Sequence, residues 1–281
     1  MTPLPMLPPG LFVTGTDTGV GKTVATAAIA CAQAAAGRRV AVLKAAQTGV
    51  SAGQPGDADF ALAALGTVQP AALACPRRYA APAAPLVAAW AEGTQVEIGP
   101  IAEAYAALAR EHELVLVEGA GGLLVPLAAG WSMADLARYL RLPLVVTARP
   151  TLGTLNHTLL TLEAARARGL VVLGLVLVGW RDTDDVATLT NPGLLVELGR
   201  VPLLGVLPWD PALSTERGQL GGLHEWCRAA LAPLLGGRFD AAAFLAACAA
   251  RVPRPIERLL APHAHRASAR PGVGDGTPGL A

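Results

Sequence analysis

GTDTGVGKT, residues 15–23, follows a short apolar run, Leu11–Thr14, and precedes an alanine-rich segment that favours helix. Glycines let consecutive backbone N–H groups turn toward one anion, and a helix that begins at the loop adds its partial positive charge. A strand, a glycine loop, Lys-Thr and a helix in this order are typical of a phosphate-binding P-loop. Five residues, where the usual motif has four, separate Gly15 from Gly21, so a chance glycine turn is the alternative interpretation.

Lys22 and Thr23 close this loop with the two side chains that a bound triphosphate needs. A lysine ammonium here neutralises the β and γ phosphates, and a threonine hydroxyl ligates Mg²⁺. The loop therefore predicts a site for a nucleoside triphosphate with magnesium.

Runs of Val and Leu alternate with longer helix-favouring segments over most of the chain. We expect strands at Leu11–Thr14, Val40–Leu43, Leu114–Val117, Leu144–Thr147, Leu170–Val178 and Leu203–Leu207. We expect helices at Lys22–Ala36, Asp59–Leu65, Ile101–Glu111, Met133–Leu140, Leu155–Arg168 and Leu194–Leu198. This alternation predicts an α/β fold, a doubly wound, mainly parallel sheet of the P-loop NTPase type in a single domain. Ligands of such sheets bind at the carboxyl ends of the strands.

Local signals set the expected helix ends. Gly37 and Gly169 fit helix stops, Ser132 fits an N-cap, and Asn191-Pro192 fits a cap followed by a first-turn proline. The predicted organisation is a short N-terminal tail (1–10), the P-loop domain (11–235), a helical extension (236–261) with a helix at Asp240–Ala250, and a disordered tail (262–281).

Composition excludes several classes of function. The 281 residues carry 22 basic and 21 acidic side chains without a basic block, so we expect neither a nucleic-acid nor an anionic-membrane partner. The longest apolar run, Leu170–Trp180, is far shorter than the ~20 residues of a membrane span. No export signal is recognisable, which predicts a cytoplasmic location.

The cysteines and the tail histidines give no sign of a metal site. Cys31, Cys75, Cys227 and Cys248 lie far apart without CxxC spacing, so we expect buried packing residues. The His263 and His265 pair lacks a third ligand nearby.

Three further positions carry charges where a sheet of this kind binds ligands. Glu118 follows the predicted strand Leu114–Val117 and precedes four small residues, Gly-Ala-Gly-Gly, so it fits a magnesium ligand better than a solvated loop glutamate. Asp57 and Asp59 offer another carboxylate but equally fit a helix N-terminus. Lys44 ends the strand Val40–Leu43 and either holds a developing anion or simply aids solubility.

Seven segments in order resemble the dethiobiotin synthetase family over about Leu11 to Asp210. They are GTDTGVGKT (15–23), VLKAAQTG (42–49), GDAD (56–59), YAAPAAP (79–85), VEGAGGLLVPL (117–127), LNHTLLTLEAARARGL (155–170) and LPWD (207–210). The resemblance implies an enzyme of biotin biosynthesis in which 7,8-diaminononanoate takes up CO₂ as a carbamate. ATP then forms a carbamic-phosphoric anhydride, and ring closure releases dethiobiotin, ADP and phosphate.

The resemblance also implies roles for residues. Lys22 and Lys44 are the expected catalytic residues, Thr23, Asp59 and Glu118 the magnesium ligands, and Thr48 and Lys44 the substrate-binding side chains. The nucleotide would contact Thr18, Gly19, Val20, Gly21, Lys22, Thr23, Val24, Asp59, Glu118, Gly119, Ala120, Gly121, Pro208, Trp209 and Asp210.

Family members are homodimers in which the substrate carboxylate rests on a helix N-terminus of the other subunit. Gly153, Thr154, Leu155 and Asn156 match that helix start, whose backbone N–H groups suit a carboxylate. His157, next in the chain, fits a structural role better than a general base. Val178-Gly179 replaces the Asn-Asp pair with which well-known members recognise adenine, and this predicts a looser preference among nucleoside triphosphates.

Two other classes of protein share the P-loop. Relatives that amidate corrin rings usually add a glutaminase domain with a nucleophilic cysteine, for which this chain leaves little room. ParA/MinD-type switch ATPases carry a second lysine early in the loop, where this sequence has Asp17. The switch ATPase stays the alternative function.

Overall fold

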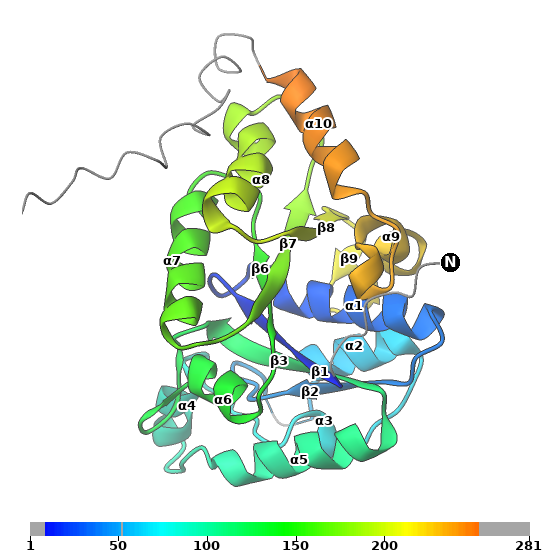
Figure 1. Ribbon diagram of the computed structural model, residues 1–281. Helices are drawn as coiled ribbons and strands as arrows, with labels where there is room; N and C mark the ends of the chain where they lie inside the picture. The colour runs from blue at the N-terminus through cyan, green and yellow to red at the C-terminus, as the bar shows by residue number, and fades with distance from the viewer. Residues whose placement is uncertain (1–8, 52, 253–281) are drawn as a thin grey trace, which may run out of the picture.

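Every strand pairing in the central sheet is parallel. The computed structural model describes residues 9–51 and 53–252 and contains a six-stranded sheet in the order β2-β3-β1-β6-β7-β8 (Figure 1). These strands are β1 (Gly10–Gly15), β2 (Val40–Lys44), β3 (Leu114–Gly122), β6 (Leu144–Ala148), β7 (Val172–Trp180) and β8 (Leu203–Pro208). Because the strands are parallel, their carboxyl ends meet at one edge, as the sequence predicted.

Helices cover both faces of this sheet. They are α1 (Lys22–Ala35), α2 (Asp57–Leu65), α3 (Ala71–Ala74), α4 (Pro85–Ala91), α5 (Ile98–Glu111), α6 (Met133–Tyr139), α7 (Thr154–Ala167), α8 (Val186–Gly199), α9 (Leu223–Ala230), the 3-10 turn η1 (Pro233–Leu235) and α10 (Ala241–Arg251). Two short hairpins, β4 (Pro126–Ala128) with β5 (Trp131–Ser132) and β9 (Leu213–Ser214) with β10 (Gln219–Leu220), lie outside the sheet.

The two faces hold two separate cores. Leu11 and Val13 of β1 pack with α1, α2 and α9, whereas Phe12 points to the other face and packs with α5, α6 and α7. Successive strand side chains alternate between faces, and both faces are apolar because helices cover both. The doubly wound α/β prediction is therefore confirmed.

Helix α8 begins earlier than the sequence predicted. Asp185 is its N-cap and accepts hydrogen bonds from the Thr188 backbone N (2.8 Å) and hydroxyl (2.7 Å). The predicted cap, Asn191, lies inside the helix, where its buried amide donates to the carbonyl of Pro150 (2.8 Å). The predicted start at Asn191-Pro192 is wrong because the Asp185 cap and this tertiary bond hold a helix that includes a proline in its interior.

The other local signals mostly hold. Ser132 caps α6 and shares a capping box with Asp135, and Gly37 and Gly169 follow helix ends with positive φ. Strand β3 continues past the predicted end at Val117 to Gly122, although its pairing with β1 is irregular between Glu118 and Gly122 and Gly121 adopts positive φ. This continuation is stabilised by pairing with β1, where Gly122 lies opposite Gly15.

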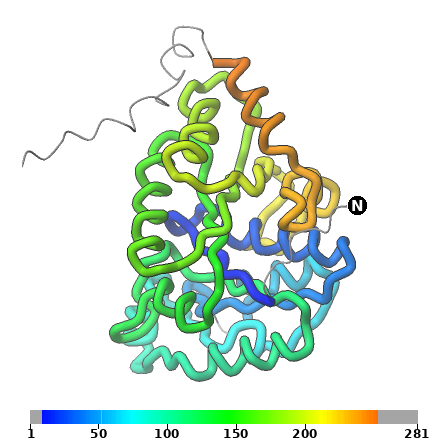
Figure 2. Tube along the Cα trace, viewed as in Figure 1, coloured from blue at the N-terminus to red at the C-terminus, as the bar shows by residue number. Residues whose placement is uncertain are grey.

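The C-terminal helix α10 packs against α8 and the end of the sheet, as Figure 2 shows in orange. It confirms the helix predicted at Asp240–Ala250, with Asp240 as its N-cap. The predicted tail 262–281, including His263 and His265, lies outside the described residues, as does most of the segment 1–10. Among residues 9–51 and 53–252, no helix is long and apolar enough to cross a bilayer.

All four cysteines are buried thiols. Burial, with a smaller contribution from Cys227, raises the pKa of Cys31 to about 12, so its reactive thiolate form is scarce near neutral pH. These observations fit the packing role that the sequence predicted.

Candidate nucleotide and substrate site

The P-loop connects β1 directly to α1. Gly19 and Gly21 both adopt positive φ, a region that L side chains rarely enter. A Cβ on Gly21 would also collide with Val178 at the end of β7. Glycine is thus required at Gly21 for backbone conformation and for space, and the loop lies against the end of β7.

Lys22 reaches back over its own loop. Its Nζ donates to the carbonyl of Asp17 (3.0 Å), and the side chain is almost fully buried. Burial, followed by the charge of Lys44, lowers the pKa of Lys22 to about 8. A bound polyanion would favour the charged form of this ammonium.

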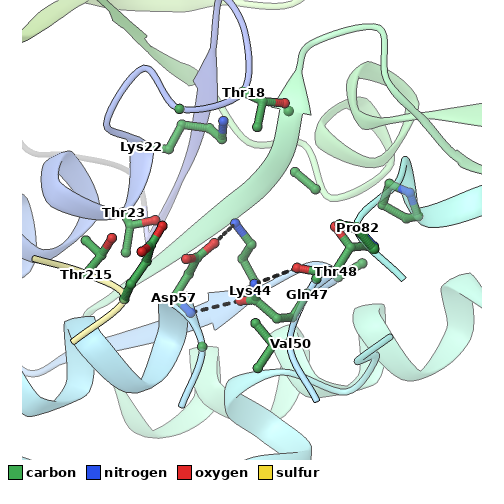
Figure 3. Close-up of a pocket in the computed structure, with 18 of the residues that line it drawn as sticks. Thr18, Lys22, Thr23, Lys44, Gln47, Thr48, Val50, Asp57, Pro82 and Thr215 are labelled. Atoms are coloured by element: carbon green, nitrogen blue, oxygen red, sulfur yellow. Dashed lines mark hydrogen bonds and ion pairs between the residues drawn. The ribbon is translucent and has the colours of Figure 1, made fainter. Parts of the chain in front are cut away.

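Lys44 is buried between two carboxylates, those of Asp57 and Glu118, with which it forms a charge cluster, and Figure 3 shows the contact with Asp57. Its Nζ is 2.5 Å from Asp57 Oδ2 and 2.6 Å from Glu118 Oε1, and it donates to the carbonyl of Gly119 (3.0 Å). Burial alone would lower the pKa of Lys44, but the charges of Glu118 and Asp57 outweigh it and raise that pKa. Lys44 is therefore a fixed cation.

The two carboxylates come from different elements. Glu118 lies opposite Lys44 in the β2–β3 register, and Asp57 begins α2. Thr23 donates its hydroxyl to Glu118 Oε1 (3.0 Å), whereas Glu118 Oε2 is buried and makes no hydrogen bond within the described part of the chain. Burial raises the pKa of Glu118, and Lys44 opposes that shift. For Asp57 the attraction of Lys44 overcomes burial and lowers the pKa.

Asp59, which the sequence analysis gave as a magnesium ligand, does not join this cluster in the structure. Its Oδ2 accepts from the backbone N of Gly56 (2.7 Å) and pairs with Arg78 (2.7 Å). Residues two apart on a helix point in widely different directions, and an acidic side chain in the third helical position folds back to cap the helix. Asp57 is the aspartate that faces Lys44.

A cavity of about 1000 Å³ opens beside the cluster. Its walls come from the P-loop and the start of α1, the segment after β2, the start of α2, Pro82–Pro85, the glycine segment of β3 and the β9–β10 hairpin. Thr48 lies in this wall, and Gln47 supports it by accepting from Asp57 N (2.8 Å) and donating to the carbonyl of Thr48 (3.2 Å).

The cavity brings together about half of the site residues that the sequence proposed. Thr18, Gly19, Gly21, Lys22, Thr23, Val24, Lys44, Thr48, Ala120 and Gly121 line it. Val20 is buried and does not line the cavity. Glu118 and Gly119 do not line it either, but both accept hydrogen bonds from Lys44, which does.

Two predicted segments lie outside its lining. Pro208, Trp209 and Asp210 follow β8, where Asp210 accepts from the backbone N of Ala212 (2.8 Å) and Gly222 (2.7 Å) and so holds a turn. Gly153, Thr154, Leu155 and Asn156 form the start of α7 and line no part of this chain's own cavity.

Sequence reasoning missed several residues near the site. Arg149 donates to the carbonyl of Thr18 (3.1 Å) and steadies the P-loop. Thr215 and Glu216 reach the cavity from the β9–β10 hairpin. Arg149 follows β6 by one residue, so its place at a strand's carboxyl end was the available signal. The short hairpin had no periodic pattern to reveal it.

The fold and the loop define a P-loop nucleotide-binding protein of the α/β class. A family model described as an AAA domain matches residues 9–217. The ATP-dependent dethiobiotin synthetase of Anaeromyxobacter dehalogenans (strain 2CP-C) is 47% identical over 214 residues, covering 76% of this chain and 96% of that relative. The enzyme of the same name from Saccharopolyspora erythraea is 49% identical over 231 residues, covering 82% and 98%. The chain belongs to the dethiobiotin synthetase family.

Solved structures support the fold alone. The MinD cell division protein of Aquifex aeolicus is 14% identical, with a TM-score of 0.50, and covers 82% of this chain and 98% of its own. This likeness reflects the shared P-loop sheet and extends to no particular activity.

Proposed function

We propose that this chain carries out ATP- and magnesium-dependent carboxylation and ring closure of 7,8-diaminononanoate with CO₂. The steps would be those of the family: a carbamate, a carbamic-phosphoric anhydride and then dethiobiotin, with ADP and phosphate released. One observation carries the proposal. The P-loop and the Lys44 cluster line a single cavity, so a triphosphate and a second anionic reactant have adjoining sites.

Each lysine has a task in this scheme. Lys22 would hold the phosphates at the start of α1, and Lys44 would stabilise the carbamate and the transferring phosphoryl group. Two anions repel when brought into contact, so the site needs fixed cations where charge develops. Lys44 suits this because the sheet and two carboxylates fix its position.

The donor set suits Mg²⁺ rather than a softer metal. Thr23, Asp57 and Glu118 supply only oxygen atoms, and Glu118 Oε2 is an unsatisfied acceptor. Within the two described ranges no group of three or more His, Cys, Asp or Glu could hold a metal, which accords with the few protein ligands that magnesium takes beside phosphates. We assign these three residues to the ion, which neutralises phosphate charge when bound.

A homodimer is part of the proposal. The start of α7, Gly153 to Asn156, would receive the substrate carboxylate of the partner subunit on its backbone N–H groups. Gly153 is exposed with positive φ at the N-cap, and the neighbouring Leu152 side chain is 87% exposed. The backbone N of Thr154 donates to the carbonyl of Thr151 (3.2 Å), so the N–H groups left for a carboxylate are those of Leu155 and Asn156. An exposed apolar side chain beside such N–H groups suits a subunit contact. The cytoplasmic location stays a prediction.

The direct test is product formation. Purified protein with 7,8-diaminononanoate, bicarbonate and Mg-ATP should yield dethiobiotin by mass spectrometry, and a reaction without the diamine should not. Phosphate release that is independent of the diamine, with no dethiobiotin, would instead favour a ParA/MinD-like switch ATPase.

Base selectivity gives a separate prediction. Val178 and Gly179 offer no side-chain amide to a base, so we expect turnover with ATP, CTP and GTP to differ by less than about tenfold. The measurement is kcat/KM for each triphosphate at saturating diamine. A strict requirement for ATP would refute this expectation.

A further inference from the structure

The end of β7 lies beside the P-loop, and an acidic loop follows it in the chain. Val178 packs against Gly21, two residues before the strand ends. The chain then runs through Asp182, Thr183 and Asp184 to the α8 cap, and the side chains of Asp182 and Asp184 are 87% and 94% exposed. Closely spaced carboxylates repel one another.

A single arginine of α10, Arg251, binds three residues of this loop. Arg251 Nη1 lies 2.5 Å from Asp182 Oδ1, and its Nη2 lies 2.9 Å from Asp184 Oδ1. The same Nη2 donates to the carbonyl of Thr183 (2.7 Å). One planar guanidinium thus ties three consecutive residues and offsets one of their two negative charges.

Aromatic packing fixes α10 on the same segment. The rings of Trp180 and Phe244 meet edge to face with centroids 4.9 Å apart. Leu189 of α8 forms a small buried cluster with Cys248 and Val252 at the end of α10. The last residue of β7 is therefore held from one side by α10, which lies beside α8 in Figures 1 and 2.

Arg181, the residue after β7, stacks on Trp209, and this pair is called the Arg181–Trp209 platform below. The guanidinium carbon of Arg181 lies 3.7 Å from the ring centroid of Trp209, whose ring is half exposed. The backbone N of Trp209 donates to the carbonyl of Trp180 (2.7 Å), which links the platform to the end of β7. Stacked planar groups of this kind suit an aromatic base.

We propose that α10, through Arg251, positions the Arg181–Trp209 platform for the base end of the nucleoside triphosphate. The inference rests on the proposed function only in requiring a triphosphate in the P-loop. With the phosphates held at Lys22, a base that reached the ends of β7 and β8 would meet this platform, because Gly21 of the P-loop lies against Val178 near the end of β7. Arg251 is a positioning residue, since it acts through the 181–184 loop.

The test compares Arg251→Ala with Arg110→Ala in the full chain. Arg110 is also an exposed arginine in the last turn of a helix, α5, so it controls for loss of a surface charge. We expect Arg251→Ala to raise the KM for ATP about three- to tenfold with kcat within about twofold, and Arg110→Ala to change neither. Arg251→Lys should fall between, because an ammonium lacks the planar fork.

Inorganic tripolyphosphate separates the base end from the phosphate end. It carries phosphates but no base, so its inhibition constant should be the same for wild type and Arg251→Ala. Removing both Asp182 and Asp184 should reproduce the KM effect, and adding Arg251→Ala to that variant should cost little more. A KM for ATP within twofold of wild type, or a parallel weakening of tripolyphosphate, would overturn the inference.

Failure of the proposed function is distinguishable from failure of this inference. Calorimetric binding of a non-hydrolysable ATP analogue needs no product, and Arg251→Ala should weaken it by the same factor. If the wild type makes no dethiobiotin but Arg251→Ala binds the analogue more weakly, the proposed function is wrong and the positioning role of Arg251 is supported.

Discussion

Replacing Lys44 by alanine should lower the rate of dethiobiotin formation by about a hundredfold to a thousandfold. This is the usual effect of removing one preorganised hydrogen-bond donor that stabilises charge in a transition state. Nucleotide affinity should change little, because the P-loop backbone and Lys22 remain. The measurements are single-turnover product formation and calorimetric binding of a non-hydrolysable Mg-ATP analogue. Activity within tenfold of wild type would make Lys44 a structural counter-ion only.

The same variant has a stability signature that tests the charge cluster itself. Removing the ammonium leaves Asp57 and Glu118 without the partner that lies within 2.6 Å of each. Breaking one side of a buried ion pair costs about 3–5 kcal/mol. Magnesium alone should then raise the Tm of Lys44→Ala more than that of the wild type, since a divalent cation compensates the same carboxylates. An equal increase in Tm with magnesium for the variant and the wild type would contradict the idea that the ion binds the same carboxylates as Lys44.

The sheet was predictable because its signals are local and repeated. Each strand of the central sheet is a largely buried apolar run, and α1, α2, α7 and α8 each follow one of these strands in the chain, so this alternation could be predicted from the pattern. The start of α8 was missed because the cap at Asp185 competes with a stronger-looking signal at Pro192, and only the tertiary bond from Asn191 to Pro150 decides between them. A tertiary contact of this kind leaves no trace in the local sequence.

The site residues were predictable where a charged side chain stands at the carboxyl end of a predicted strand. Lys44 and Glu118 end neighbouring strands, and their register brings them together. The choice between Asp57 and Asp59 was not predictable, because both stand in the first turn of α2 and either fits a cap. In the structure Gln47 accepts from the backbone N of Asp57 and Arg78 pairs with Asp59, and neither long-range contact could be predicted from the local sequence. The Arg181–Trp209 pair was equally hidden, since it joins residues from two strand ends.

Substituting Asp57 by asparagine should raise the magnesium concentration for half-maximal activity at least about tenfold, whereas Asp59→Asn should leave that concentration within about twofold. Asparagine keeps the shape of each side chain and removes one charge. Asp57 faces Lys44 and Thr23, where a lost carboxylate weakens a hard cation directly. Asp59 faces Arg78 at the surface, where an ion pair contributes about 0–1 kcal/mol of stability.

Glu118→Gln completes the series and should shift the magnesium titration at least as far as Asp57→Asn. Glu118 is fully buried, and its free Oε2 has no competing partner in the described structure. Activity measured against total magnesium at fixed ATP separates the three variants, and Tm values check that each is folded. A shift for Asp59→Asn and none for Asp57→Asn would return the metal to Asp59. That outcome would require α2 to rotate when the nucleotide binds, because in this structure Asp59 is held by Gly56 and Arg78.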